Sequence, residues 1–527
     1  MSKNLEQQLW ASADILRGKM DASEYKNYLL GLVFYKYLSD KQLRAVYKME
    51  NGVVEHYPER EEMFVTLVDW FEEEADELKD NSVIKLGYFI EPEDLFYALR
   101  KNEFDFRLSK LSDAFTKLSQ QGDQFEGLFD DIDLSSTKLG SNDQQRNITI
   151  TEVIKVLDEI DLFGYEGDVI GDAYEYLISQ FAAGAGKKAG EFYTPQAVSK
   201  IISEIVSLGQ EELAPFHIYD PAMGSASLML NIADYVINKN NVYYHGQELN
   251  TTTYNLARMN LILHGVEKLR MRLSNGDTLD EDWPKEEPNQ FDAVVMNPPY
   301  SAKWSAADKF LSDTRFERYG KLAPKSKADF AFLLHGYYHL KETGTMGIVL
   351  PHGVLFRGAA EGTIRKVLLE AGAIDAVIGL PANIFYGTSI PTTVLILKKN
   401  RSSRDVFFID ASREFEKQKN QNFLRNEDIK EIIDTYVKRE SVDKYAYAAT
   451  FDEIVENEYN LNIPRYVDTF EEEEPIDMVV LGKDMVSLNA EIKKAEKEFL
   501  AMLDELAVTE DTKDIIEATK EVFRSGQ

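Results

Sequence analysis

The stretch Phe291-Asp292-Ala293-Val294-Val295-Met296-Asn297-Pro298-Pro299-Tyr300 decides the fold. Its first six residues predict a buried strand, because five of them are apolar and no helical period interrupts the run. The two prolines that follow fix the backbone and remove two N–H groups, so the strand must end there. The stretch therefore predicts a buried strand whose carboxyl end carries a stiff polar loop.

Similar short apolar runs lie on both sides of this strand and alternate with helical segments. The runs are 216–220, 243–248, 345–350, 374–380 and 392–397, and the helical segments include 251–264 and 328–340. Such alternation predicts a doubly wound α/β sheet, in which ligands bind beyond the carboxyl ends of the strands. We therefore expect the chemistry of this chain to lie just after each run.

The first 160 residues predict a helical domain. Apolar residues recur there at helical spacing, and the stretch Asp21-Ala22-Ser23-Glu24 predicts a helix start. The spaced residues are Leu5, Leu9, Ala13 and Leu16, then Tyr28, Leu30, Val33, Phe34 and Tyr37. Because no catalytic constellation occurs in this part, we expect a packing or interaction domain.

The last 60 residues or so differ in sequence pattern from the two parts before them. The acidic stretch 470–475 predicts a linker, and apolar residues beyond it step alternately by three and four, as in a heptad seam. They are Met485, Leu488, Ile492, Ala495, Phe499, Met502 and Leu506. Two interpretations stay open: a helix that folds back on its own body, or one that packs on a partner. The expected domains are 1–160, 161–467 and 468–527.

The composition excludes several classes of protein. A chain of 527 residues has room for roughly two to four domains. It contains no cysteine, which excludes disulfides, thiolate zinc sites and the covalent cysteine route to cytosine C5 methylation. Neither a long apolar run nor a signal peptide is found, so we expect a cytoplasmic protein without a membrane span.

The net charge of −32 bears on possible partners. Proteins that bind DNA without a partner protein are usually basic, because the neutralisation of DNA phosphates supplies much of the affinity. Taken alone, the charge favours a substrate other than nucleic acid. A DNA-directed function would require a local basic surface or a basic partner.

The loop Asn297-Pro298-Pro299-Tyr300 suits the chemistry of a planar amine. The Asn297 side-chain oxygen and the Pro298 carbonyl can converge as two acceptors on one nitrogen. Such an amine is a weak nucleophile, and two acceptors on its hydrogens stabilise the positive charge that develops during methylation. Tyr300 can stack on the substrate ring. Both adenine and cytosine present such an amine.

Three further strand ends predict a nucleotide-like cofactor. The turn Asp220-Pro221-Ala222-Met223-Gly224-Ser225-Ala226 can bring backbone N–H groups close to a ligand, although it lacks the dinucleotide fingerprint. Glu248 ends the next run, at a position where a carboxylate often binds ribose hydroxyls. Asp277 follows a third strand and could accept a hydrogen bond from an adenine amino group. Taken alone, each of these three segments could equally be an ordinary turn or a solvent-exposed carboxylate without a ligand.

In this order, the motifs resemble those of the methyltransferase (modification) subunit of type I restriction–modification systems, the HsdM family. Gly190-Glu191-Phe192-Tyr193-Thr194-Pro195-Gln196 resembles motif X, and it precedes the segment that resembles motif I, which starts at Asp220. Glu248, Asp277 and Asn297–Tyr300 stand where motifs II, III and IV have their functional residues. Segments near 10–40, 380–392 and 459–466 are also similar to the family, so the resemblance covers nearly the whole chain.

The resemblance implies a class I, Rossmann-like methyltransferase core with a helical N-terminal domain and a C-terminal helical tail. It implies transfer of a methyl group from S-adenosylmethionine to N6 of a flipped adenine in double-stranded DNA. The cofactor would contact Glu191, Phe192, Tyr193, Thr194, Pro195, Gln196, Asp220, Met223, Gly224, Ser225, Ala226, Glu248 and Asp277, and the catalytic residues would be Asn297, Pro298, Pro299 and Tyr300. No metal is implied. The chain departs from the family at Ala226 and Ser227, where further glycines are usual.

The resemblance also implies partners. Two copies of the subunit join one specificity subunit, and a restriction subunit can be added. The recognition sequence would then reside in another chain. Within this chain, residues 301–330 hold seven basic and four acidic side chains, and this loop either contacts the DNA backbone or is simply solvated.

Two other functions compete with this interpretation. The same Asn-Pro-Pro-Tyr loop occurs in enzymes that methylate RNA guanine amines or protein glutamine side chains. The position of the motif X segment ahead of Asp220 and the large helical flanks disfavour them. A purely structural assembly subunit is disfavoured because Asn297 and Tyr300 are both present.

Overall fold

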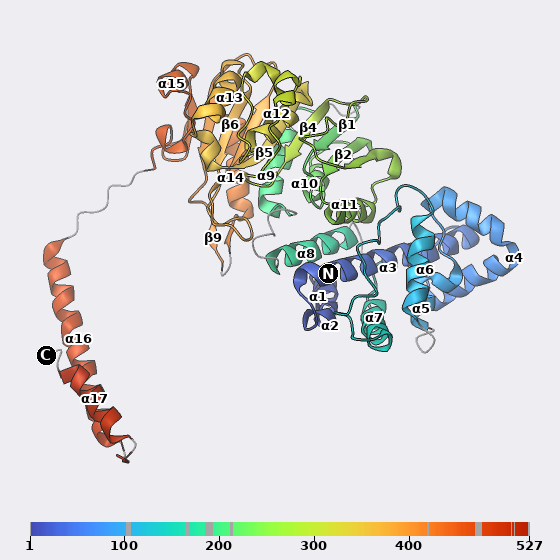
Figure 1. Cartoon of the computed structure of the whole chain (residues 1–527), viewed down its shortest axis with the longest axis horizontal. Coiled ribbons are helices and arrows are strands. Elements are labelled where there is room, and N and C mark those ends of the chain that lie inside the picture. The colour runs from blue at the N-terminus through green and yellow to red at the C-terminus, as the bar shows by residue number, and fades with distance from the viewer. Residues whose placement is uncertain are drawn as a thin grey trace. The chain divides into compact units, whose positions relative to one another are not determined.

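The computed structural model describes residues 2–101, 107–163, 169–184, 193–210, 214–418, 421–469, 477–506, 508–510 and 512–524. The chain divides into two compact units, Met1–Asp468 and Thr469–Gln527. Figure 1 shows helices at the beginning of the first unit, followed by a sheet covered by helices. No helix among the described residues is long and apolar enough to cross a membrane.

The beginning of the chain is helical, as predicted. Its helices are α1 (Ser2–Ser12), α2 (Asp14–Arg17), α3 (Ala22–Asn51), α4 (Arg60–Leu86), α5 (Phe96–Lys101), α6 (Leu108–Ser119) and α7 (Asp143–Asp158). The predicted helix start is confirmed, because Asp21 precedes α3 and its backbone N–H donates to the Glu24 side chain. The regularly spaced Leu5, Leu9, Ala13 and Leu16 are all buried in the core of this helical part.

Helix α8 (Val169–Gly184) joins this helical part to the sheet. It packs against α1 and α3 on one side and against α11 (Thr251–Leu263) on the other. The Tyr174 hydroxyl lies 3.4 Å from Leu30 O and 3.5 Å from Met259 Sδ. Arg258 of α11 donates to the carbonyls of Asp123 and Glu126. The helical part is therefore packed directly against a helix of the α/β part.

A nine-stranded sheet forms the centre of the α/β part, in the order β11-β8-β6-β7-β5-β4-β1-β2-β3. Its strands are β1 (Phe216–Asp220), β2 (Val242–Glu248), β3 (Met271–Asn275), β4 (Phe291–Met296), β5 (Leu340–Pro351), β6 (Ile374–Gly379), β7 (Thr392–Lys398), β8 (Val406–Asp410) and β11 (Ala446–Ala449). The short strands β9 (Glu416–Lys417) and β10 (Asn422–Phe423) form a separate pair. Each of the six predicted runs is a strand, and the strand expected before Asp277 is β3.

Helices cover both faces of the sheet, as the doubly wound prediction requires (Figure 1). One face packs against α9 (Gln196–Val206), α10 (Ser227–Ile232), α11 and α14 (Asn426–Lys438), and the other against α12 (Asp329–Tyr338) and α13 (Ala359–Glu370). Strand β7 runs antiparallel between β5 and β6, whereas β1 to β5 are mutually parallel where they pair. The carboxyl ends of β1, β2, β3 and β4 therefore share one edge.

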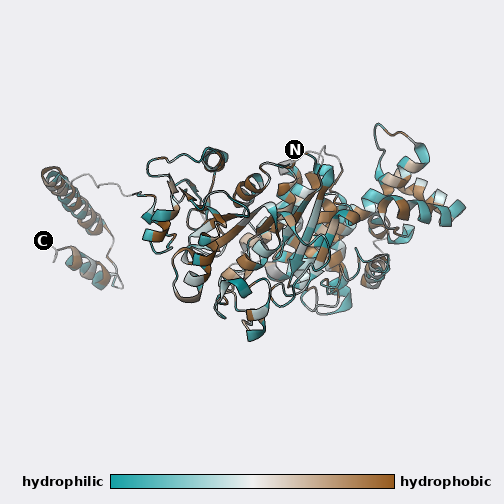
Figure 2. Cartoon of the chain, turned by 90° about the horizontal axis from the view of Figure 1, so that it is seen from above, coloured by the Kyte–Doolittle hydropathy of each residue, from teal (hydrophilic) through white to brown (hydrophobic). Residues whose placement is uncertain are grey.

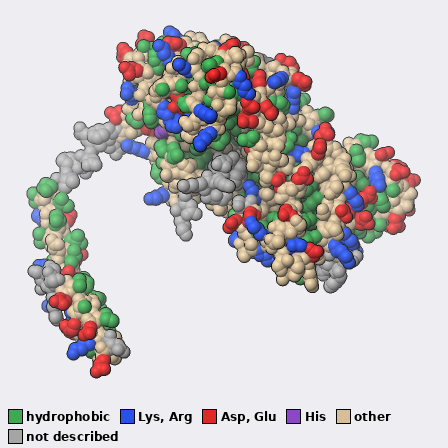
Figure 3. Space-filling model, viewed as in Figure 1, with side chains coloured by type: hydrophobic (Ala, Val, Ile, Leu, Met, Phe, Trp, Pro, Cys, Tyr) green, Lys and Arg blue, Asp and Glu red, His purple; other side chains and the backbone are tan. Residues whose placement is uncertain are grey.

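The C-terminal unit is a helical pair, α16 (Met478–Glu505) and α17 (Lys513–Arg524). Asp477 caps α16 by accepting from the N–H groups of Val479 and Val480. The two helices meet at Phe499 and Phe523, whose ring centroids lie 5.1 Å apart. Helix α16 has no fully buried residue. Hydrophobic residues recur along it (Figure 2), and hydrophobic side chains lie on its surface (Figure 3). The predicted seam is helical up to Glu505, and Leu506 lies just past the helix end.

Candidate active site

Backbone hydrogen bonds tie three strand-end loops together. Met223 N donates to Gln247 O over 3.0 Å, and Gly276 N donates to Glu248 O over 3.1 Å. Gly224 N also donates to the Glu248 carboxylate over 3.1 Å. The structure thus brings together the three segments in which the sequence placed Asp220, Glu248 and Asp277.

The turn after β1 has the conformation that glycine favours at two positions. Gly224 has φ +54°, and Ala226 has φ +65° with its side chain fully buried. An L-residue in the left-handed region costs roughly 1–2 kcal/mol. This explains why glycine suits the position of Ala226. The backbone turn is nonetheless formed, with Ala226 N donating to Met223 O over 2.8 Å.

The two carboxylates at the ends of β1 and β2 have shifted pKa values. Burial raises the pKa of Asp220 well above its ordinary value, and its carboxylate accepts from Ala222 N over 2.9 Å. Burial also raises the pKa of Glu248, although the N–H groups of Asn250 and Gly224 oppose this shift. Asp277 is exposed and accepts from Leu279 N over 3.0 Å. Hydroxyl or ammonium donors of a ligand would favour the ionised forms of Asp220 and Glu248.

The loop after β4 holds its two functional side chains against each other. The Tyr300 hydroxyl donates to Asn297 Oδ1 over 2.8 Å, and Asn297 Nδ2 donates to Thr194 Oγ1 over 3.2 Å. The Tyr300 ring meets the Phe385 ring edge to face, with centroids 5.9 Å apart. Burial raises the pKa of Tyr300 well above its ordinary value, so its hydroxyl stays protonated and remains a donor. The segment 193–196 and the loop 297–300 are therefore in direct contact.

A small cavity marks the point where these segments meet. Its lining residues are Tyr193, Thr194, Asp220, Ala222, Met223, Gly224, Ser225, Ser227, Leu228 and Asn297. Its volume of about 10 Å³ is far below the roughly 300–1,000 Å³ of ligand pockets. This cavity therefore has room for only a part of a cofactor the size of S-adenosylmethionine, and Glu248 and Asp277 lie outside its lining. The donors and carboxylates around the cavity suit that cofactor, because it offers hydroxyl, amine and carboxylate groups to them.

The other predicted site residues lie at or near this edge. Pro195 and Gln196 begin α9, directly after Thr194, and Pro298 and Pro299 connect Asn297 to Tyr300. Glu191 and Phe192 lie outside the described residues. Ser227 and Leu228 also line the cavity, although the sequence did not mark them as contacts. Their position at the first two residues of the helix that follows the Gly224 turn is the signal that could have found them.

The basic loop after the catalytic segment differs from the expectation in one respect. Of its seven basic side chains, Arg315 is only 2% exposed and therefore is not available for DNA. Lys309 is paired with Asp280 at 2.7 Å, whereas Lys303, Lys321 and Lys325 are exposed. A buried Asp329 fastens the start of the loop by accepting from Ser301 N over 2.8 Å.

Comparisons with known proteins agree with this geometry. The N-6 DNA Methylase family matches residues 165–475, and the HsdM N-terminal domain family matches residues 5–157. The chain belongs to the N-6 DNA methylase family of type I restriction–modification methyltransferase subunits. It is accordingly an adenine-specific DNA methyltransferase subunit with a class I methyltransferase fold.

Individual relatives match over most of their length. The type I restriction enzyme MpnII methylase subunit of Mycoplasma pneumoniae is 37% identical, over 97% of this chain and 98% of the relative. The MjaVII methylase subunit of Methanocaldococcus jannaschii is 32% identical, over 94% and 82%. A crystal structure of the type I methyltransferase subunit from Streptococcus thermophilus is 57% identical. It superposes with a TM-score of 0.86 over 89% of this chain and all of that one.

Proposed function

We propose that this subunit binds S-adenosylmethionine at the ends of β1, β2 and β3 and methylates a flipped adenine held by Asn297–Tyr300. The observation that carries the proposal is the contact between Thr194, at the cavity, and Asn297, at the start of the catalytic loop. This contact supports a cofactor site that lies next to the two proposed acceptors for the target amine. The cofactor supplies the electrophilic methyl group, and the residues of this chain orient the base toward it.

In this proposal, the residues of the motif X segment and of the strand ends each contact a different part of the cofactor. In our proposal Glu248 accepts hydrogen bonds from the ribose hydroxyls, and Asp277 accepts one from the cofactor adenine. Asp220 and the backbone of 222–226 hold the methionine end, with Tyr193 and Thr194 covering it. Glu191, Phe192, Pro195 and Gln196 complete this cover.

The catalytic loop then acts on the amine of the target. The Asn297 side-chain oxygen and the Pro298 carbonyl accept the two amine hydrogens, which stabilises the positive charge that develops on nitrogen. Pro299 keeps the loop rigid, and the Tyr300 ring stacks on the base. The methylated nitrogen is strongly acidic and loses its extra proton readily, so no strong general base is needed.

Assembly completes the proposal. We infer that two copies of this chain bind one specificity subunit, that a restriction subunit can join them, and that the exposed seam of α16 packs on a helix of a partner. The supporting observations are the apolar side chains along α16 and the net charge of −32, which makes a second source of DNA affinity necessary. The domain limits 1–160, 161–467 and 468–527 also remain a proposal.

The test is methyl transfer from labelled cofactor in the presence of the specificity subunit. We expect labelled adenine in DNA and no label in RNA or protein. Asn297→Ala should lower the rate by about 10²–10³-fold while cofactor binding is retained, since one acceptor at the developing charge is lost. Asn240→Ala, an exposed asparagine ahead of β2, is the matched control and should be fully active. Label in RNA or protein, or an active Asn297→Ala enzyme, would overturn the proposal.

A further inference from the structure

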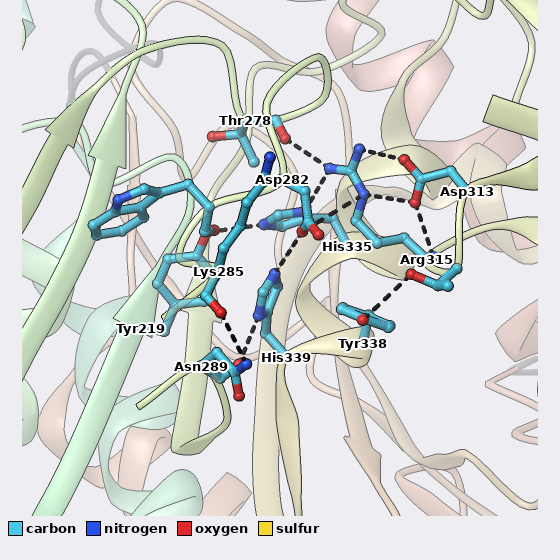
Figure 4. Close-up of polar contacts among 12 residues, drawn as sticks. Tyr219, Thr278, Asp282, Lys285, Asn289, Asp313, Arg315, His335, Tyr338 and His339 are labelled. Atoms are coloured by element: carbon cyan, nitrogen blue, oxygen red, sulfur yellow. Dashed lines mark hydrogen bonds and ion pairs between the residues drawn. The ribbon is translucent and has the colours of Figure 1, made fainter. Parts of the chain in front are cut away.

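Arg315 is a fully buried arginine in the loop that follows the catalytic segment. Its guanidinium points away from solvent and into a network of polar groups, which Figure 4 shows. Nη1 donates to Thr278 O over 3.0 Å, and Nη2 donates to Leu279 O over 3.3 Å. Both Nε and Nη2 also donate to the Asp313 carboxylate, at 3.0 and 2.7 Å. One side chain of this loop therefore holds the two residues that directly follow Asp277.

The other side of the guanidinium rests on α12. Arg315 Nη1 donates to His335 Nδ1 over 3.1 Å, and the other ring nitrogen of His335 lies 2.8 Å from the Tyr219 hydroxyl. Burial lowers the pKa of His335 well below its ordinary value, so the ring is neutral and can accept at Nδ1. Its Nε2–H then donates to Tyr219, whose hydroxyl donates to Trp283 O over 2.7 Å. Every polar group in this chain of contacts has a partner.

This network also contains three side chains of types that bind metals. Donor atoms of Asp282, His335 and His339 lie within 4.8 Å of one another. However, the Arg315 guanidinium already contributes a positive charge there, with Nε 3.8 Å from Asp282. Both ring nitrogens of His335 are engaged as well. The positive charge of Arg315 therefore already lies beside these three side chains, where a metal ion would otherwise bind. Asp282 and His335 help to hold the arginine in place.

Thr278 and Leu279, whose carbonyls accept from Arg315, lie at the edge of the sheet where we propose that the cofactor binds. The Thr278 hydroxyl donates to Pro221 O, in the turn after β1, and lies 3.1 Å from the side-chain amide of Gln247 in β2. Thr278 thus connects the loops after β1 and β3 with the end of β2. Through Arg315 this group is joined to the loop after β4, which leads from the catalytic residues to α12.

We propose that Arg315 is a positioning residue that couples cofactor binding to the ordering of loop 304–328. This inference rests on the proposed cofactor site at Asp220, Glu248 and Asp277. Asp220 and Ala222 line the cavity, and Pro221 between them accepts from the Thr278 hydroxyl. A ligand that moves this turn therefore also moves Thr278 and Leu279, whose carbonyls hold the guanidinium, and Arg315 transmits the movement to the loop. By thermodynamic reciprocity, ordering the loop also tightens cofactor binding by the same factor.

The coupling can be measured by hydrogen exchange with S-adenosylhomocysteine as the probe. In the wild-type full chain, saturating ligand should slow exchange in peptides from 304–328 by about 10-fold, within the usual range of coupling between sites. Arg315→Lys keeps the charge but loses the forked geometry. We expect it to bind the ligand about 10-fold more weakly and to show no ligand-dependent slowing when saturated.

Arg401→Lys is the matched control. Like Arg315, Arg401 donates to backbone carbonyls and to a carboxylate. Its partners are the carbonyls of Gly372, Ile374 and Asp405 and the Asp375 carboxylate, which lies 3.0 Å away. Arg401 differs in its place, because it lies at the amino end of β6. Its replacement should lower thermal stability without changing ligand affinity or the loop response. If Arg315→Lys fails to fold, the milder Asp313→Asn loosens the same guanidinium and should weaken the response.

The outcomes separate the two proposals. Ligand binding with no change in loop exchange in the wild type, or an unchanged response in Arg315→Lys or Asp313→Asn, would overturn the coupling and leave the cofactor site standing. Calorimetry that detects no binding of S-adenosylhomocysteine to the wild type would overturn both.

Discussion

At the scale of single residues, the hydrogen bond between Tyr300 and Asn297 bears most directly on catalysis. It engages Asn297 Oδ1, which we propose as an acceptor for the amine of the target base. Because an amide oxygen can accept two hydrogen bonds, a base that enters can share this oxygen with the tyrosine hydroxyl or replace that hydroxyl. Thr194 accepts from the amide nitrogen of the same side chain and helps to keep its orientation when a base binds.

We predict different effects for two changes of Tyr300. Tyr300→Phe removes one neutral hydrogen bond, worth about 0.5–1.5 kcal/mol, and should change kcat by less than about 10-fold. Tyr300→Ala also removes the ring that contacts Phe385 and the base, and should reduce kcat/KM for DNA at least about 100-fold. Steady-state kinetics with the assembled enzyme would check both. Equal losses in the two variants would show that the hydroxyl, rather than the ring, is the functional group.

A second prediction concerns Glu248 and pH. Burial raises the pKa of this carboxyl, so the protonated form persists to higher pH than in an ordinary glutamate. Only the ionised form accepts from both ribose hydroxyls. Cofactor affinity should therefore rise as pH increases through the raised pKa and level off above it. Titration calorimetry over this range would measure the slope.

Glu248→Gln provides the control for this pH dependence. It should bind more weakly at high pH and lose part of the slope, and the remainder belongs to Asp220, whose pKa is also raised by burial. A variant that retained the complete slope would show that Glu248 does not face the ribose.

At the scale of elements, α16 is a long helix whose apolar stripe lacks full cover. Ile492 is 47% exposed and Leu488 is 58% exposed, whereas the contact with α17 involves Phe499 near the end of the helix. The first interpretation of the heptads, a helix that folds back within the chain, applies to the end of α16. Packing of the preceding turns on a partner stays a prediction. The end folds against α17, and the preceding turns present apolar surface.

We predict that Ile492→Lys weakens binding to the specificity subunit about 10- to 100-fold, since burying such a side chain contributes about 1.5–3 kcal/mol. Ala490→Lys places the same charge on the opposite side of α16 and should bind normally. Co-elution of the two subunits in size-exclusion chromatography, with ligand affinity as a folding check, would measure this. Equal loss in both variants would argue against the stripe as the interface.

At the scale of the whole molecule, the negative net charge indicates that most of the DNA affinity comes from another subunit. The chain carries a net charge of −32, yet Lys321 and Lys325 are exposed in the loop beside the catalytic segment. We predict that the isolated chain binds DNA only weakly at physiological salt and gains affinity with the specificity subunit.

In the assembled enzyme, replacing Lys321 and Lys325 together with alanine should lower the slope of log affinity against log salt by about 2, equally for all sequences. Fluorescence anisotropy at several salt concentrations would measure the slope. Lys239→Ala is the control, because this lysine precedes β2 at the opposite end of the strands and pairs with Asp234. An unchanged slope in the double variant would remove this loop from the DNA surface.

Much of the fold could be predicted because its signals are local. The apolar runs marked six strands of the large sheet, and the polar stretch before α3 marked a helix start. Strands β8 and β11 and helix α17 were not predicted, and nothing local distinguishes β7, which runs antiparallel, from its neighbours. Strand direction depends on where the chain returns to the sheet, which is a property of the connections.

The sequence by itself determined the order of the motifs and the strand ends that carry them, and it predicted the catalytic loop, because each depends on a few consecutive residues. Only the tertiary structure decided that Tyr300 donates to Asn297, that Ala226 adopts the left-handed conformation, and that Arg315 is buried. In sequence, Arg315 is one more cation in a basic loop. Its function is set by carbonyls 36 and 37 residues away, which no local pattern can bring together.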